Sequence, residues 1–178
     1  MARVAQKVTI ADLGLGNLHS VAQAFSRAGV SAEITRDPAA LRSAERLVFP
    51  GQGAFRECAE VLATEVGPAL RDFIATGRPY LGICLGMQAL FETSEESEGQ
   101  GLGVFGGRVV RFAPDMHDPD TGDRLKVPHM GWNQVDTAHP MVESGNWYYF
   151  VHSYYVVPTD PSLVAATSDY GVRFCAAV

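Results

Sequence analysis

Short apolar segments alternate with longer amphipathic segments through the first half of the chain. Four apolar runs have the length of buried β-strands: 8–13, 31–35, 46–49 and 80–83. Apolar residues recur at helical spacing in three segments between or after them: 17–28, 55–75 and 85–91. This alternation is typical of a parallel sheet with helices on both faces, so it predicts an α/β fold.

The second half of the chain has a different pattern. Residues 92–101 are acidic and rich in glycine, which predicts a solvated loop. Short β-rich runs then follow one another with turn residues between them: 107–112, 124–127, 132–135, 147–151, 153–157, 163–167 and 172–178. They predict a mixed or antiparallel, β-rich C-terminal extension of the parallel sheet. The length of 178 residues suits one domain, 1–178.

Composition excludes several classes of protein. The net charge of −6 removes an electrostatic drive toward nucleic acids or anionic membrane surfaces. No apolar run has the roughly 18 to 20 residues that cross a bilayer. Three widely spaced cysteines do not form a disulfide framework, which favours a cytoplasmic location. No cysteine–histidine cluster predicts a metal, and neither early glycine loop completes the GxGxxG pattern, so we expect no cofactor.

The most informative segment is 80–88, which reads YLGICLGMQ and contains G-x-C-x-G between a strand and a helix. A nucleophile at Cys84 would lie on a sharp, strained turn, with Gly82 and Gly86 allowing the chain to pass itself. Unpaired N–H groups in the following helical turn could stabilise a thiolate and an oxyanion. The alternative interpretation is a buried cysteine between two packing glycines.

A second loop, 49–55, reads FPGQGAF and also follows a strand. The carboxyl ends of parallel strands meet at one edge of the sheet, where open α/β folds bind ligands. Consecutive amides around Gly51, Gln52 and Gly53 could therefore donate to an oxyanion beside Cys84. An ordinary strand-to-helix turn is the alternative.

The segment GICLGMQ resembles the nucleophile elbow of class I, triad-type glutamine amidotransferases. Three further stretches strengthen the resemblance and extend it from about residue 8 to the end: DLGLGNL at 12–18, KVPHMGWN at 126–133 and FVHSY at 150–154. The resemblance implies a flavodoxin-like α/β architecture whose parallel or mixed central sheet has helices on both faces. It also implies a glutaminase that forms a heterodimer with a (β/α)8-barrel cyclase subunit and passes ammonia to it through an interior channel.

Residue roles follow from the same resemblance. Cys84 would attack the side-chain amide of glutamine and form a thioester. The oxyanion would be held by backbone amides at Gly51, Gln52 and Leu85. The residues implied in glutamine binding are Gly53, Gln88, His152, Ser153 and Tyr154. Those implied at the partner interface are Asn17, Met130, Trp132 and Asn133.

The chain departs from the family pattern in two places. Gln52 and Leu13 replace an aliphatic and an aromatic residue. The family completes its triad with His-Pro-Glu near the C-terminus, whereas this sequence has no histidine after His152. A chain that lacks its C-terminal end would explain this, and a catalytically impaired, partner-binding subunit is the alternative. A cysteine hydrolase of other substrates, and His129 as base for Cys84, are weaker alternatives.

Overall fold

The computed structural model describes residues 7–178. They form two compact units, one made of residues 7–92 and 97–104 and the other of residues 93–96 and 105–178. Each unit is described separately below. That the two units act as one domain stays a prediction.

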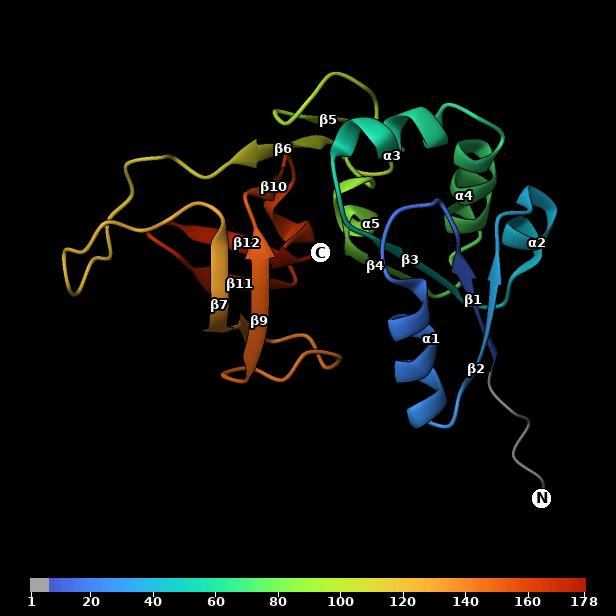
Figure 1. The fold of residues 1–178 in the computed structure, drawn as a ribbon, viewed down its shortest axis with the longest axis horizontal. Helices are drawn as coiled ribbons and strands as arrows, with labels where there is room; N and C mark the ends of the chain where they lie inside the picture. The colour runs from blue at the N-terminus through green and yellow to red at the C-terminus, as the bar shows by residue number, and fades with distance from the viewer. Residues whose placement is uncertain (1–6) are drawn as a thin grey trace. The chain divides into compact units, whose positions relative to one another are not determined.

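The first unit is built on a parallel sheet of four strands: β1 (Lys7–Ala11), β2 (Ser31–Thr35), β3 (Leu47–Gly51) and β4 (Tyr80–Cys84). Their order is β2-β1-β3-β4, and every neighbouring pair is parallel (Figure 1). All four predicted strands are present, and their ends differ from the predicted ranges by at most two residues. The α/β class is confirmed.

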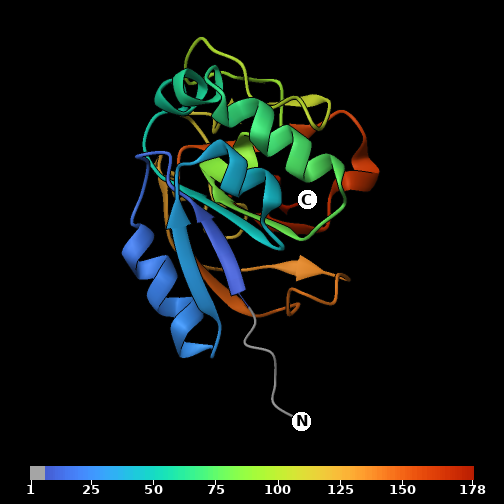
Figure 2. The ribbon, with the colours of Figure 1, turned by 90° about the vertical axis from the view of Figure 1, so that its right-hand side faces the viewer.

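Helices cover both faces of this sheet. They are α1 (Leu18–Arg27), α2 (Pro38–Ser43), α3 (Phe55–Leu62), α4 (Val66–Ala75) and α5 (Leu85–Gln88). The chain reverses direction across the sheet after β2, and right-handed crossovers therefore place α1 on one face and α2 and α4 on the other, as Figure 2 shows. The predicted apolar stripe of α1 packs against Val8, Ile10 and Val48.

The helices differ from the prediction in three respects. The segment 55–75 forms two helices, α3 and α4, because the helical conformation is interrupted between Leu62 and Val66. The short helix α2 has too few residues to show a periodicity, although Asp37 caps its first turn and Pro38 occupies the first helical position. Helix α5 ends at Gln88, three residues before the predicted end.

The second unit consists mainly of antiparallel strands. One sheet has the order β5-β6-β10-β12-β11-β8 and contains β5 (Thr93–Ser94), β6 (Gly107–Arg111), β8 (Asp136–Thr137), β10 (Tyr154–Pro158), β11 (Ala166–Asp169) and β12 (Arg173–Ala177). A separate antiparallel pair joins β7 (His129–Gln134) to β9 (Trp147–His152). These strands thus form separate sheets. The sequence pattern predicted instead that they would extend the parallel sheet.

Two predicted β runs of this unit are wrong in part. Residues 124–127 form no strand, and only an isolated bridge pairs His117 with Arg124. The run 163–167 begins in the short 3-10 helix η1 (Pro161–Leu163) before β11 starts. Both segments contain or adjoin turn formers, which a hydrophobic pattern alone does not locate. Among residues 7–178, no helix is both long and apolar enough to cross a bilayer.

Candidate active site

Cys84 is the last residue of β4 and immediately precedes α5. Its φ is 56° and its ψ is −109°, and no other residue besides glycine has a positive φ between residues 7 and 178. Such a conformation costs on the order of 1 to 3 kcal/mol and occurs mainly at functional sites. The side chain is exposed and its thiol is free of any disulfide. The predicted strained turn at the carboxyl end of the fourth strand is therefore present, and the buried-cysteine alternative is wrong.

The two glycines around Cys84 are required by close backbone approach. A carbon atom added at Gly82 would lie 2.3 Å from the carbonyl oxygen of Gly86. One added at Gly86 would lie 1.8 Å from the carbonyl oxygen of Phe49. No side chain fits at these distances, so the turn can form only with glycine at both positions.

Tyr80 supports the turn from below, which the sequence analysis missed. Its hydroxyl donates a 2.8 Å hydrogen bond to the carbonyl oxygen of Gly86. Burial, and secondly the neighbouring Cys58, raise the pKa of Tyr80 well above its usual value, so the hydroxyl keeps the proton that it donates. A tyrosine at the start of an apolar strand carries no sequence signal for this role.

The loop after β3 lies beside Cys84. Gly51 pairs with Cys84 in the parallel register of β3 and β4. A carbon atom added at Gly51 would lie 2.8 Å from Cβ of Leu85, so two of the predicted oxyanion residues adjoin the nucleophile. Gln52 is exposed, and a carbon added at Gly16 would lie 3.5 Å from its amide nitrogen. The loop before α1 and the loop after β3 therefore meet at one edge of the sheet.

The remaining predicted residues of this unit lie near the same edge. Asn17 caps α1, where its Oδ1 accepts a hydrogen bond from the amide of Ser20. Gly53 has a φ of 110° and is exposed, whereas Gln88 is 7 % exposed at the end of α5. Because α5 has only one turn, it contributes individual N–H donors to the site and little of a helix dipole.

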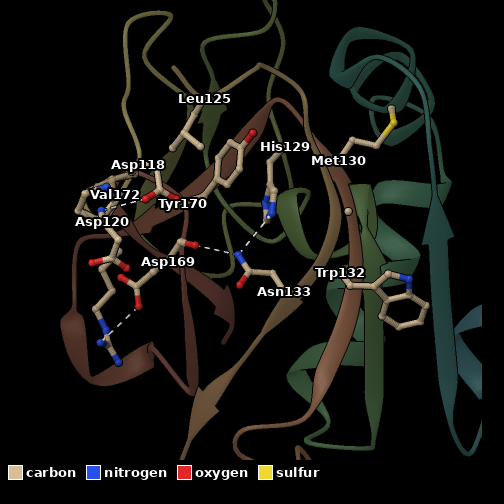
Figure 3. A pocket seen from close by; sticks show the side chains of 14 residues that line it. Asp118, Asp120, Leu125, His129, Met130, Trp132, Asn133, Asp169, Tyr170 and Val172 are labelled. Atoms are coloured by element: carbon tan, nitrogen blue, oxygen red, sulfur yellow. Dashed lines mark hydrogen bonds and ion pairs between the residues drawn. The ribbon is translucent and has the colours of Figure 1, made fainter. Parts of the chain in front are cut away.

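In the second unit, Met130, Trp132 and Asn133 lie on β7 and His152 ends β9, while Ser153 follows β9 and Tyr154 begins β10. The register places His129 opposite His152, Met130 opposite Val151, and Trp132 opposite Tyr149. Met130 and Trp132 point away from His129 and Asn133 in Figure 3, as expected from the alternation of side chains along a strand. Met130 is 60 % exposed and Trp132 is 66 % exposed, so neither belongs to the core.

His129 and His152 form a hydrogen-bonded pair, with 3.0 Å between His129 Nδ1 and His152 Nε2. His152 Nδ1 lies 2.9 Å from the carbonyl oxygen of Tyr154, and His129 Nε2 lies 3.4 Å from Nδ2 of Asn133. All four ring nitrogens thus have protein partners. His129 is not available as a base for another group, and the side chain of His152 has no free nitrogen for glutamine.

Burial determines the charge of the pair. It lowers the pKa of His129 to about 4, with the charge of His152 as the second cause. Burial also lowers the pKa of His152, against the opposing effect of its hydrogen bond to Tyr154. Both rings are therefore neutral near pH 7.

A cavity of about 470 Å³ adjoins this pair (Figure 3). Its wall includes His129 and Asn133, the ring of Tyr170, and the carboxylates of Asp118 and Asp120. Tyr170 stacks on His129 with 3.9 Å between the ring centroids. Sequence reasoning could not find this cluster, because its members are brought together only by strand pairing.

Comparison with known proteins agrees with these features. A model of the class I glutamine amidotransferase family matches residues 9–178. The chain is 54 % identical to the imidazole glycerol phosphate synthase subunit HisH of Syntrophotalea carbinolica, over 96 % of this chain and 85 % of that protein. It is 50 % identical to the HisH subunit of Rhodopirellula baltica, over 96 % of this chain and 83 % of that protein.

Solved structures with little sequence identity share the fold. A glutamine amidotransferase crystal structure superposes with a TM-score of 0.67 at 18 % identity, covering 89 % of this chain and 78 % of that one. The PurLQS structure from Thermotoga maritima has a TM-score of 0.67 at 14 % identity, covering 94 % and 76 %. The strained Cys84 turn, the family match over 9–178 and the identity to HisH subunits lead to one conclusion: the chain belongs to the class I glutamine amidotransferase family and, within it, to the HisH group.

Proposed function

We propose that the chain is the glutaminase subunit of imidazole glycerol phosphate synthase, which supplies ammonia for the synthesis of imidazole glycerol phosphate and AICAR in histidine biosynthesis. The observation that carries this proposal is the backbone of Cys84, whose φ of 56° presents an exposed thiol at the carboxyl edge of a parallel sheet. Strain of this kind is maintained only where the surrounding structure enforces it, here through Gly82, Gly86 and Tyr80.

The chemistry proceeds in two balanced steps. The thiolate of Cys84 attacks the side-chain amide carbon of glutamine, and the C–N bond breaks as the nitrogen takes up a proton and leaves as ammonia. Water then attacks the resulting thioester, releasing glutamate and restoring the thiol. Backbone amides of Gly51, Gln52 and Leu85 are proposed to stabilise the oxyanion in both steps. The proton transfers require a histidine base of the kind that the family's His-Pro-Glu segment supplies.

Glutamine recognition is assigned to Gly53, Gln88, His152, Ser153 and Tyr154. Because both ring nitrogens of His152 are already hydrogen-bonded within the protein, we assign its contribution to the backbone and to the orientation of its neighbours.

The proposed partner is a cyclase subunit with a (β/α)8-barrel fold. Its docking surface would include Met130 and Trp132, whose large apolar side chains are more than half exposed on one face of the β7–β9 pair. Asn17 and Asn133 are also assigned to the interface with this partner. A cytoplasmic location is supported by the cysteines of residues 7–178, which form no disulfide.

The direct test is labelling of the chain with a glutamine analogue that carries an electrophilic carbon in place of the side-chain amide. Mass spectrometry should find one adduct, on Cys84, and glutamine should compete with its formation. Cys84→Ser should abolish the adduct, whereas Cys58→Ser, which replaces a buried thiol, should leave it unchanged. A stable complex with the cyclase subunit should be detected by calorimetry. Labelling that glutamine does not slow would contradict the proposed substrate.

A further inference from the structure

The His129–His152 pair lies in the two-stranded sheet, next to its joint with the six-stranded sheet. His129 belongs to β7 and His152 to β9, which pair only with each other, whereas Tyr154 begins β10 in the six-stranded sheet. Ser153 is the single residue between β9 and β10. The hydrogen bond from His152 to the carbonyl of Tyr154 bridges this residue, and the amide of Phe112 donates to the carbonyl of Ser153 over 3.0 Å. The joint is thus held from both sides.

The hydrogen bonds of the pair have a single consistent direction. The Tyr154 carbonyl can only accept, so His152 carries its proton on Nδ1, and its Nε2 must accept. The proton between the rings therefore belongs to Nδ1 of His129. Nε2 of His129 then accepts from the amide group of Asn133, which also donates to the carbonyl of Asp169 over 2.8 Å. An additional proton on His152 would place two N–H groups against each other.

Aromatic rings enclose both histidines. Phe150 and Tyr170 stack on His129 at centroid distances of 5.0 and 3.9 Å, and Phe112 meets the ring of His152 edge-on at 5.1 Å. His129 is 3 % exposed. The rings therefore have no room to rotate away from their hydrogen bonds, so that a shift of β7 moves His152 and the joint with it.

We propose that His129 and His152 are positioning residues that transmit the state of the partner-facing pair β7–β9 to the Ser153–Tyr154 backbone, where glutamine is held. The inference rests on the proposed function of the site. Neither histidine touches the reacting atoms. Docking of a partner on Met130 and Trp132 would shift Ser153 through the hydrogen bond between the rings. Without that bond, only backbone pairing within β7–β9 and the bond from Asn133 to the Asp169 carbonyl would remain, and the coupling would weaken.

The proposed coupling requires both histidine rings to remain neutral. Few charged groups near the rings would favour their protonation. Tyr170 faces His129 from the loop between β11 and β12, and its hydroxyl donates to the carbonyl of Lys126. Asp169 approaches through its carbonyl, while its carboxylate pairs with Arg173 at 3.7 Å. Asp118 and Asp120 line the adjoining cavity. On the side of β10, Tyr155 packs against Phe112 and not on the histidines. No carboxylate among residues 7–178 is recorded in a hydrogen bond or ion pair with either ring.

The test separates glutamine binding from the reactivity of Cys84. The rate of labelling by the electrophilic glutamine analogue is measured against its concentration, with and without the cyclase subunit. His129→Phe keeps an aromatic ring between Phe150 and Tyr170 but removes both hydrogen bonds. We expect the half-saturating concentration to rise about tenfold and the maximal rate to change less than twofold, with the effect of the cyclase lost. His129→Asn keeps a donor near the position of Nδ1 and should restore most of the affinity.

A control and a spectroscopic measurement complete the test. His117→Phe changes an exposed histidine of the same unit and should leave both labelling parameters unaltered. In the unsubstituted chain, nitrogen-15 NMR of the imidazoles should show His152 protonated on Nδ1 only at pH 7, whatever the stability of the variants. Protonation on Nε2 would overturn the proposal. So would an unchanged half-saturating concentration and an intact cyclase effect in His129→Phe.

Failure of the underlying function has a different signature. If the chain is not a glutaminase, glutamine does not slow the labelling of the unsubstituted protein, and the positioning role is overturned together with the function on which it rests. If glutamine competes normally but His129→Phe and His117→Phe behave alike, the function stands and the positioning role is wrong.

Discussion

A carbon atom added at Gly86 would lie 1.8 Å from the carbonyl oxygen of Phe49, so the first turn of α5 is pressed directly against strand β3. This contact holds Cys84 in its strained conformation, because α5 cannot move outward without losing the hydrogen bond between Tyr80 and the Gly86 carbonyl. The proposed nucleophile Cys84, the loop after β3 and the strand β3 are therefore packed together.

Gly86→Ala should disrupt this packing. We expect the free energy of unfolding to fall by about 3 kcal/mol, since the backbone of β3 has to move. The rate at which the glutamine analogue labels Cys84 should fall by at least as much, when the ratio of the two rates is expressed as a free energy. Chemical denaturation and labelling rates measure the two effects. Gly106→Ala is the matched control, because its added carbon would have ordinary contacts of 3.6 Å or more with Thr159. Equal behaviour of the two variants would show that the close approach at Gly86 has no consequence.

Trp132→Ala should weaken binding of the cyclase subunit by about tenfold or more while changing the melting temperature little. The side chain is 66 % exposed and makes an edge-on contact with Tyr149, so its removal leaves no cavity in the core. Calorimetric titration with the cyclase and thermal unfolding provide the two readouts. Met141→Ala removes another large apolar side chain, 83 % exposed and outside β7 and β9, and should affect neither. A large loss of stability with unchanged affinity would place Trp132 in the core instead.

Acid should destabilise the chain through His129. Its pKa is lowered to about 4 in the folded state, so the unfolded chain takes up the proton first as the pH falls below about 6.5. Stability from this group is fully present above pH 6.5 and is lost progressively down to about pH 4. Since the ring borders a cavity, solvent screening reduces the effect, and we expect about 1 kcal/mol between pH 7 and pH 5.

Urea unfolding of the unsubstituted chain and of His129→Phe at both pH values checks this expectation. The variant has no proton to gain at this position and should lose less stability on acidification. The same pH dependence in both proteins would assign the acid sensitivity to other groups.

The turn at Cys84 could be predicted from the sequence because the residues that it requires are close together in the chain. The pattern G-x-C-x-G is short, and its two glycines are required by contacts of the turn with itself and with the neighbouring strand. The four parallel strands and the amphipathic face of α1 were equally visible, since buried strands and helices impose periods of their own on the apolar residues. Even so, the break between α3 and α4 and the early end of α5 depended on packing that periodicity does not describe.

The second unit shows what only tertiary structure decides. His129 and His152 are 23 residues apart, and nothing in the order of residues states that β7 and β9 pair in the register that opposes them. A slip of β9 by one residue would turn His152 to the face of Met130 and Trp132 and separate it from His129. The sequence by itself determined the proposed nucleophile, Cys84, and the class of the fold. Strand register and burial depend on contacts distant along the chain, and they determined that two histidines form a hydrogen-bonded pair and that Trp132 is exposed.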